Sequence, residues 1–134
     1  MVPISIDLVR LYVHVLAATV WVGGQITLAG LVPTLRDLGP DAPKAAARAF
    51  NRVAWAAFAV LIVTGVWNIV EIDVSERSTE YQVVLLAKLL VVALAGISAA
   101  IHAGARTKVV LAVGGAATLL TSLVALFLGV WLHG

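Results

Sequence analysis

The sequence contains no cysteine, and its single methionine is the first residue. Without cysteine there are no disulfides, no thiolate metal sites and no redox-active thiols. Copper(I) prefers soft sulfur ligands, so the scarcity of sulfur leaves this chain chemically poorly equipped for copper transport. A metal bound by this chain would therefore depend on nitrogen or oxygen ligands.

Charged residues are also scarce. Only 12% of the 134 residues are charged, whereas 62% are hydrophobic and the mean hydropathy is +1.06. A soluble domain would be about 45–50% apolar, so this composition predicts a small multi-pass protein of the lipid bilayer. The net charge of +2 comes from loop lysines and arginines, which in a membrane protein report orientation and do not indicate nucleic-acid binding.

Long uncharged runs predict four membrane-spanning helices. Residues 11–35 carry no formal charge, and such a length crosses a hydrocarbon core of about 30 Å. This run is too long for a cleavable signal peptide, so the first helix should stay in the mature protein. Glycine and prolines between Arg36 and Lys44 predict a loop. We expect an all-α, four-helix transmembrane bundle forming one domain over residues 1–134, with helices at about 5–34, 45–71, 80–104 and 107–133.

The distribution of basic residues predicts the orientation. Arg10 and Arg77 are the basic residues of the N-terminus and the second loop, whereas the first and third loops hold six. The positive-inside rule then places both termini outside, in a bacterial-type cell membrane. His14, Lys88 and His133 fall in the outer half and His102 in the inner half. The six basic residues of the inner loops are Arg36, Lys44, Arg48, Arg52, Arg106 and Lys108.

Ionisable residues inside a span are candidate functional residues, because each must find a partner or line a cavity. His14 and His102 have no carboxylate within the spans to pair with, which argues against a proton relay and for a ligand that needs neutral imidazole. Lys88 is either buried or extends its ammonium group to the outer interface. His133 is either a ligand or a solvated residue at the end of its helix.

Haem b fits these residues, because haem iron accepts an axial histidine and the macrocycle can lie between helices lined with small and apolar side chains. His14 is the expected outer ligand, and His102 the inner ligand if a second haem is present. Lys88 and His133 are alternative sixth ligands. The fourth helix has a face of small residues that suits either close helix packing or a flat ligand. That face comprises Gly115, Thr118, Ser122, Ala125 and Gly129.

Arginines at both ends of the spans are candidate partners of the haem propionates. Arg10 and Tyr12 would serve the outer side. Arg48, Arg52 and Arg106 would serve the inner side. In the first span, residues spaced by three or four positions form one polar face beside the expected haem. They are Arg10, His14, Ala18, Trp21 and Gln25.

Three segments carry a resemblance to a known family. YVHVLAATVWVGG in the first span, FNRVAWAAFAVLIVTGVW in the second and LLAKLLVVALAGISAAIHAGAR in the third resemble the membrane part of the copper resistance protein D family. The chain is also similar, more weakly, to the bacterial membrane protoporphyrinogen oxidases. That resemblance implies a haem b protein in which the first-helix His14 and the third-helix Lys88 are important.

Three functions remain open at this point. The first is cytochrome-like electron transfer between a quinol or small oxidant and haem, in a membrane oxidoreductase. The second is a copper or haem transporter of the copper resistance D type. The third is an assembly subunit without catalysis, in which the polar residues only fix helix packing. A homodimer is expected, because four short spans leave part of a macrocycle facing lipid unless a second protomer covers it.

The predicted orientation can be tested with a reporter fused after Gly134. Because both termini should lie outside, a periplasmic reporter should be active there and a cytoplasmic reporter inactive. The matched control is the same pair of reporters fused within the third loop, after Ala105. Cytoplasmic activity of the Gly134 fusion would reverse the half of the bilayer assigned to each histidine.

Overall fold

A computed structural model describes residues 2–134 and contains long helices without any strand in this range. Four helical segments are long and apolar enough to cross a membrane: Ile6–Leu38, Ala42–Glu71, Thr79–Ala103 and Lys108–His133. The predicted all-α fold with four membrane-spanning helices is therefore confirmed. By its internal contacts the chain divides into two compact units, Met1–Ile72 and Asp73–Gly134. The single domain over the whole chain stays a prediction.

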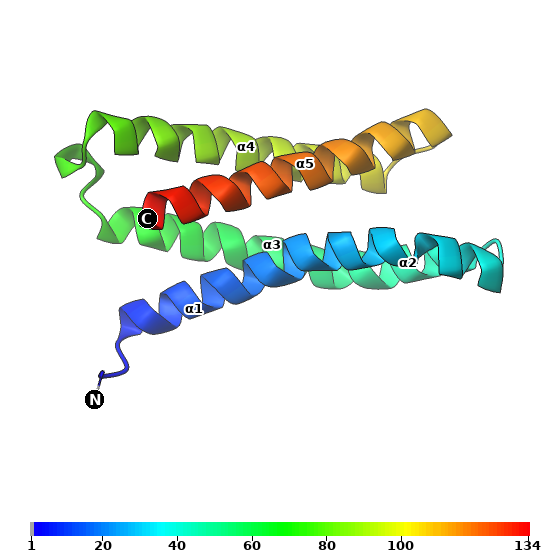
Figure 1. Cartoon of the computed structure of the whole chain (residues 1–134), viewed down its shortest axis with the longest axis horizontal. Helices are drawn as coiled ribbons and strands as arrows, with labels where there is room; N and C mark the ends of the chain where they lie inside the picture. Colours follow the sequence, from blue (N-terminus) through cyan, green and yellow to red (C-terminus); the bar gives the residue numbers. More distant parts are fainter. Residues whose placement is uncertain (1) are drawn as a thin grey trace. The chain divides into compact units, whose positions relative to one another are not determined.

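The first unit is a helical hairpin made of α1 (Ile6–Ala18), η1 (Thr19–Gly23), α2 (Gly24–Leu38) and α3 (Ala42–Glu71). Figure 1 shows α3 running back along the continuous α1–η1–α2 segment. The loop predicted for residues 36–44 is much shorter than expected. Pro33 lies inside α2, the helix continues beyond it, and Gly39, at φ +154°, makes the turn. Glycine suits this position because it has no Cβ to clash at such a φ.

The π-helical turn η1 interrupts the regular spacing that the sequence predicted for the first span. Thr19, the first residue of the turn, donates to Val15 O at 2.8 Å, and Gln25, which follows the turn, donates to Trp21 O at 2.9 Å. Single π turns are rare and often mark functional sites. The α-helical spacing of three and four that placed Trp21 and Gln25 on the face of Arg10 and His14 therefore does not apply across this turn.

The second unit is a hairpin of η2 (Val74–Glu76), α4 (Thr79–Ala103) and α5 (Lys108–His133). In Figure 1 the two long helices are antiparallel neighbours. Ser78 and Thr107 cap them, since their hydroxyls accept from Tyr81 N and Val110 N. Asp73 precedes η2, and its hydrogen bond from the Ser75 hydroxyl lowers the pKa of its carboxyl. The Asp73 carboxylate therefore stays charged to a lower pH than an ordinary aspartate would.

Close packing of the second hairpin depends on Gly114. A Cβ at this position would lie 3.1 Å from Cα and Cβ of His102 and 3.3 Å from its backbone nitrogen. Backbone cannot turn aside as a flexible side chain can, so any larger residue would push α4 and α5 apart. The absence of a side chain at Gly114 therefore sets the separation of these helices.

We expect Gly114→Ala to destabilise the protein by about 1–3 kcal/mol, the usual effect of overpacking a tight contact. Thermal unfolding in a fixed detergent measures this. Gly30→Ala is the matched control, because a Cβ at that helical glycine meets nothing within 4 Å. The control should be neutral or slightly stabilising, as alanine favours helix more than glycine. Equal melting temperatures for the two variants would contradict the role assigned to Gly114.

Candidate metal-binding histidines

His14 of α1 is held by a hydrogen bond to α3. Its Nδ1 lies 2.6 Å from the hydroxyl oxygen of Thr64, which is buried with 6% exposure. The same hydroxyl lies 2.6 Å from Val60 O in its own helix. Gly65 gives the ring ordinary contact, since a Cβ there would be 3.6 Å from Cε1 of His14. The hydrogen bond at Nδ1 thus helps to orient the imidazole.

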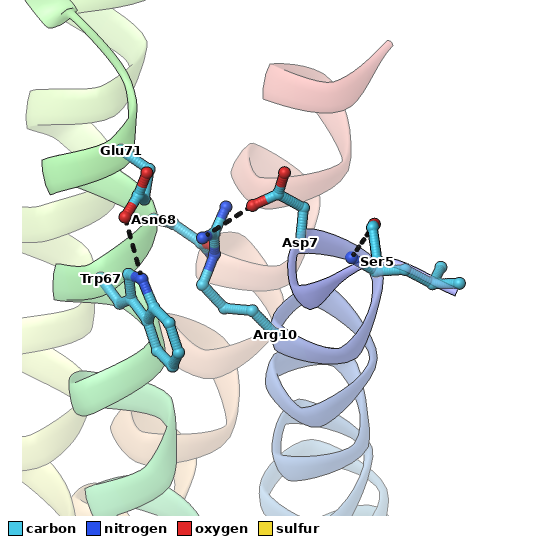
Figure 2. A network of polar contacts seen from close by, with 7 residues as sticks. Ser5, Asp7, Arg10, Trp67, Asn68 and Glu71 are labelled. Atoms are coloured by element: carbon cyan, nitrogen blue, oxygen red, sulfur yellow. Dashed lines mark hydrogen bonds and ion pairs between the residues drawn. The ribbon is translucent and has the colours of Figure 1, made fainter. Parts of the chain in front are cut away.

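Arg10 lies one helical turn before His14 and is bound within the same hairpin (Figure 2). Its Nε donates to Oδ1 of Asn68 at 2.6 Å, and its Nη1 pairs with Asp7 at 3.0 Å. The guanidinium also lies 5.4 Å from the ring centre of Trp67, and the side chain is only 10% exposed. Trp67 in turn donates to Glu71 at 3.2 Å. Arg10 is therefore a bridge between α1 and α3, with its charge balanced by Asp7.

The two polar contacts between these helices share one spacing. Arg10 and His14 are four residues apart on α1, and their partners Asn68 and Thr64 are four apart on α3. Residues four apart lie on the same face of a helix. Because the helices are antiparallel, the two contacts form successive rungs and fix the register of α1 against α3.

Trp21 belongs to an aromatic cluster in the first hairpin. Its ring centre is 4.6 Å from that of Phe58 and 5.8 Å from that of Trp55, and the tryptophan is 5% exposed. Such tilted and edge-on arrangements are favourable for aromatic pairs. These contacts give Trp21 a packing role, and its contact with a cofactor stays a prediction.

His102 of α4 is held by α5. Its Nδ1 lies 2.8 Å from Leu111 O, and since a carbonyl oxygen only accepts, Nδ1 carries a proton. The ring rests on Gly115, where a Cβ would be 3.0 Å from Cε1 and 3.2 Å from Nδ1. The side chain is half-buried. The small-residue face of α5 thus makes room for this imidazole at Gly115.

Lys88 lies against the same face of α5 near the other end of the hairpin. A Cβ at Gly129 would be 3.2 Å from its Nζ. Lys88 is half-buried, and no carboxylate among residues 2–134 forms an ion pair with it. At Gly115 and Gly129 the small-residue face therefore admits side chains of α4. The sequence had left open whether that face serves close packing or a flat ligand.

The other predicted site residues are exposed. His133 is the last residue of α5, and Arg48, Arg52 and Arg106 are also exposed. His14 and Arg10 share the first hairpin, whereas Lys88, His102 and His133 share the second. Residues 2–134 contain no group of three histidine, cysteine, aspartate or glutamate side chains placed to hold a metal ion. The described residues of either hairpin therefore do not form a three-ligand metal site by themselves.

Sequence reasoning missed the partners that orient the histidines. Thr64, Asn68 and the carbonyl of Leu111 were not candidates. One signal for the first two was available, because their spacing of four on the second span matches the spacing of Arg10 and His14 on the first. No sequence signal identifies a backbone carbonyl as the partner of His102.

The four apolar helices define a multi-pass membrane protein. The sequence model of copper resistance protein D matches residues 44–132, about two thirds of the chain. The chain therefore belongs to the copper resistance protein D family, as its motifs predicted. The match includes Thr64, Lys88 and His102 but not His14. No curated protein and no solved structure matches the chain.

We expect Asn68→Ala to lower stability by about 1.5–3 kcal/mol, the range for a hydrogen bond to a charged group. The physical reason is that the Nε–H of the largely buried Arg10 would lose its acceptor at 2.6 Å. Thermal unfolding in lipid nanodiscs measures the change. Asn51→Ala is the control, since Asn51 is exposed on the same helix. A loss of stability no larger than that of Asn51→Ala would show that the Arg10–Asn68 hydrogen bond does not stabilise the protein.

Proposed function

We propose that this protein carries copper ions through the membrane, with the imidazoles of His14 and His102 as its metal-binding groups. Membership of the copper resistance protein D family favours copper as the substrate. One observation supports this proposal most directly. Each hairpin has a histidine within a span, and the Nδ1 atom of that histidine is hydrogen-bonded to the neighbouring helix, which orients the ring. Metal-binding histidines are characteristically held in this way, with one nitrogen fixed by a second group and the other used for the metal.

The ligand chemistry supports transient binding of copper. Imidazole suits copper, whereas the thiolate and thioether groups that would hold copper(I) tightly are missing from the spans. No cluster of three ligands was found in residues 2–134, so a closed cage for permanent storage is not formed by one hairpin alone. Weak sites that release their cargo are what transport requires.

The predicted topology supports transport across the membrane. His14 belongs to the outer half of the bilayer and His102 to the inner half, if the basic loops face the cytoplasm. One imidazole would then serve each side. The exposed His133, at the end of α5, has no such orienting bond, and we assign it no part in transport.

A test is copper(I) uptake into liposomes that contain the purified protein. His14→Ala and His102→Ala should each reduce the initial rate at least about tenfold, because even the outer-shell partners of metal ligands contribute about that much to affinity. Thr121→Val is the control, since it removes a half-buried polar group of α5 that bonds only carbonyls of its own helix. Uptake at the wild-type rate in both histidine variants would overturn the proposal.

Haem b electron transfer is the second candidate, and one observation favours it: each hairpin supplies a single oriented imidazole, and one axial histidine is enough for haem iron. His14 would be the outer ligand, and the similarity to protoporphyrinogen oxidases implies that Lys88 is also important for the haem protein. Bound haem would supply one-electron chemistry with a quinol or small oxidant. The homodimer, the redox partner and the location in the cell membrane stay predictions with this reading.

The absorption spectrum of the purified protein separates the two functions. A Soret band with reducible α and β bands belongs to haem, and under that reading His14→Ala should remove the outer haem while the protein stays folded. An unchanged Soret intensity per protein in His14→Ala would exclude His14 as its ligand. Copper dependence with no Soret band would leave only the first function.

A further inference from the structure

We propose that Thr64 is the positioning residue of the His14 site: its hydroxyl fixes the imidazole as the tautomer protonated on Nδ1, so that Nε2 carries the lone pair. This deepens the proposed function by stating which atom meets the metal, and it rests on that function only for the identity of the metal. The tautomer itself follows from two distances around one oxygen atom.

The hydroxyl proton of Thr64 is committed to its own helix. The hydroxyl oxygen lies 2.6 Å from Val60 O and 3.3 Å from Leu61 O, and carbonyl oxygens have no proton to give. Two oxygens at 2.6 Å would repel each other without a proton between them. Thr64 must therefore donate to Val60, and its single hydroxyl proton is used there.

The oxygen of Thr64 can then only accept from His14. Nδ1 and the hydroxyl oxygen are 2.6 Å apart, so this contact also needs a proton, which must come from Nδ1. In a neutral imidazole one nitrogen is a donor and the other an acceptor. With Nδ1 protonated, Nε2 has the lone pair that a metal ion requires.

Three features keep this arrangement in place. Thr64 is 6% exposed, so water does not compete readily for its hydroxyl. The Arg10–Asn68 rung lies one turn away on both helices and holds α1 in register with α3. Gly65, next to Thr64, presents no side chain to the ring. Thr64 and Gly65 lie in the second-span segment that resembles the copper resistance protein D family, and neither residue was assigned a role from the sequence alone.

The same logic gives His102 the same tautomer by a different route. Leu111 O accepts from Nδ1 at 2.8 Å, so Nε2 again carries the lone pair. A substitution can remove the Thr64 hydroxyl that bonds His14, but no side-chain substitution removes the backbone carbonyl of Leu111 that bonds His102. Thr64 is thus the position at which the tautomer can be altered by substitution.

The test uses nitrogen-15 NMR of the histidine rings in the full-length, metal-free protein in lipid bilayers. The His14 signals are identified by their loss in His14→Asn. In the wild type, Nε2 should resonate as an unprotonated nitrogen and Nδ1 as a protonated one. Thr64→Val keeps the shape but removes the acceptor, so His14 should shift toward the Nε2-protonated tautomer, whereas Thr64→Ser should retain the wild-type signals.

Thr118→Val is the matched control. Thr118 is also 6% exposed, and it donates to the carbonyl four residues earlier, Gly114 O, at 2.7 Å. Its replacement should leave the His14 tautomer unchanged. A wild-type ring protonated on Nε2, or an unaltered tautomer in Thr64→Val, would overturn the proposal. If Thr64→Val does not fold, Thr64→Ala takes its place, and the wild-type spectrum alone still decides whether Nδ1 is protonated.

Copper(I) titration against a competing chelator provides the second readout. Thr64→Val should bind copper(I) about 10–100-fold more weakly, the usual loss on removing the partner of a metal-binding histidine. Thr64→Ser should stay close to the wild type. If the tautomer shifts in Thr64→Val but the wild type binds no copper, the positioning role is supported and the copper function is refuted. The failure of one proposal can therefore be told apart from the failure of the other. Equal affinities of a copper-binding wild type and Thr64→Val would overturn the role of Thr64.

Discussion

The demand that every polar group in a bilayer find a partner governs this structure. Water is missing from the hydrocarbon region, so a polar side chain there must bond within its own helix or to a neighbouring one. The hydroxyl groups of Thr19, Thr64 and Thr118 each donate to the carbonyl four residues earlier. Arg10, His14 and His102 reach across to the other helix of their hairpin. These few crossing bonds set the register of each hairpin.

Small residues are the second requirement, because they let the helices pack closely. Helices in lipid gain little from burying apolar side chains, because lipid is equally apolar, and they associate through close packing and hydrogen bonds. Gly114 lets α5 approach the backbone of His102, and Gly115 accepts its ring. The crossing bond from His102 to Leu111 needs that approach. Packing and polar bonding thus support the same contact.

These contacts explain why the two neutral histidines are better candidate ligands than the arginines. Arg10 is balanced by Asp7 and bonded to Asn68, and the inner arginines are exposed. Each of the two histidines uses Nδ1 to bind its hairpin. The single hydroxyl of Thr64 bonds its own helix and also determines which nitrogen of His14 carries the lone pair.

The sequence alone determined the class of protein. Uncharged runs long enough to cross a bilayer predicted four helices, and the motifs around Thr64, Lys88 and His102 predicted the family, because length, charge and motif order are properties of the chain itself. Only the tertiary structure showed that the turn after α2 needs so few residues and that η1 interrupts the first span. It alone paired His14 with Thr64 and His102 with a carbonyl of α5. Such pairs depend on the register and separation of two helices, which a pattern along one helix does not specify.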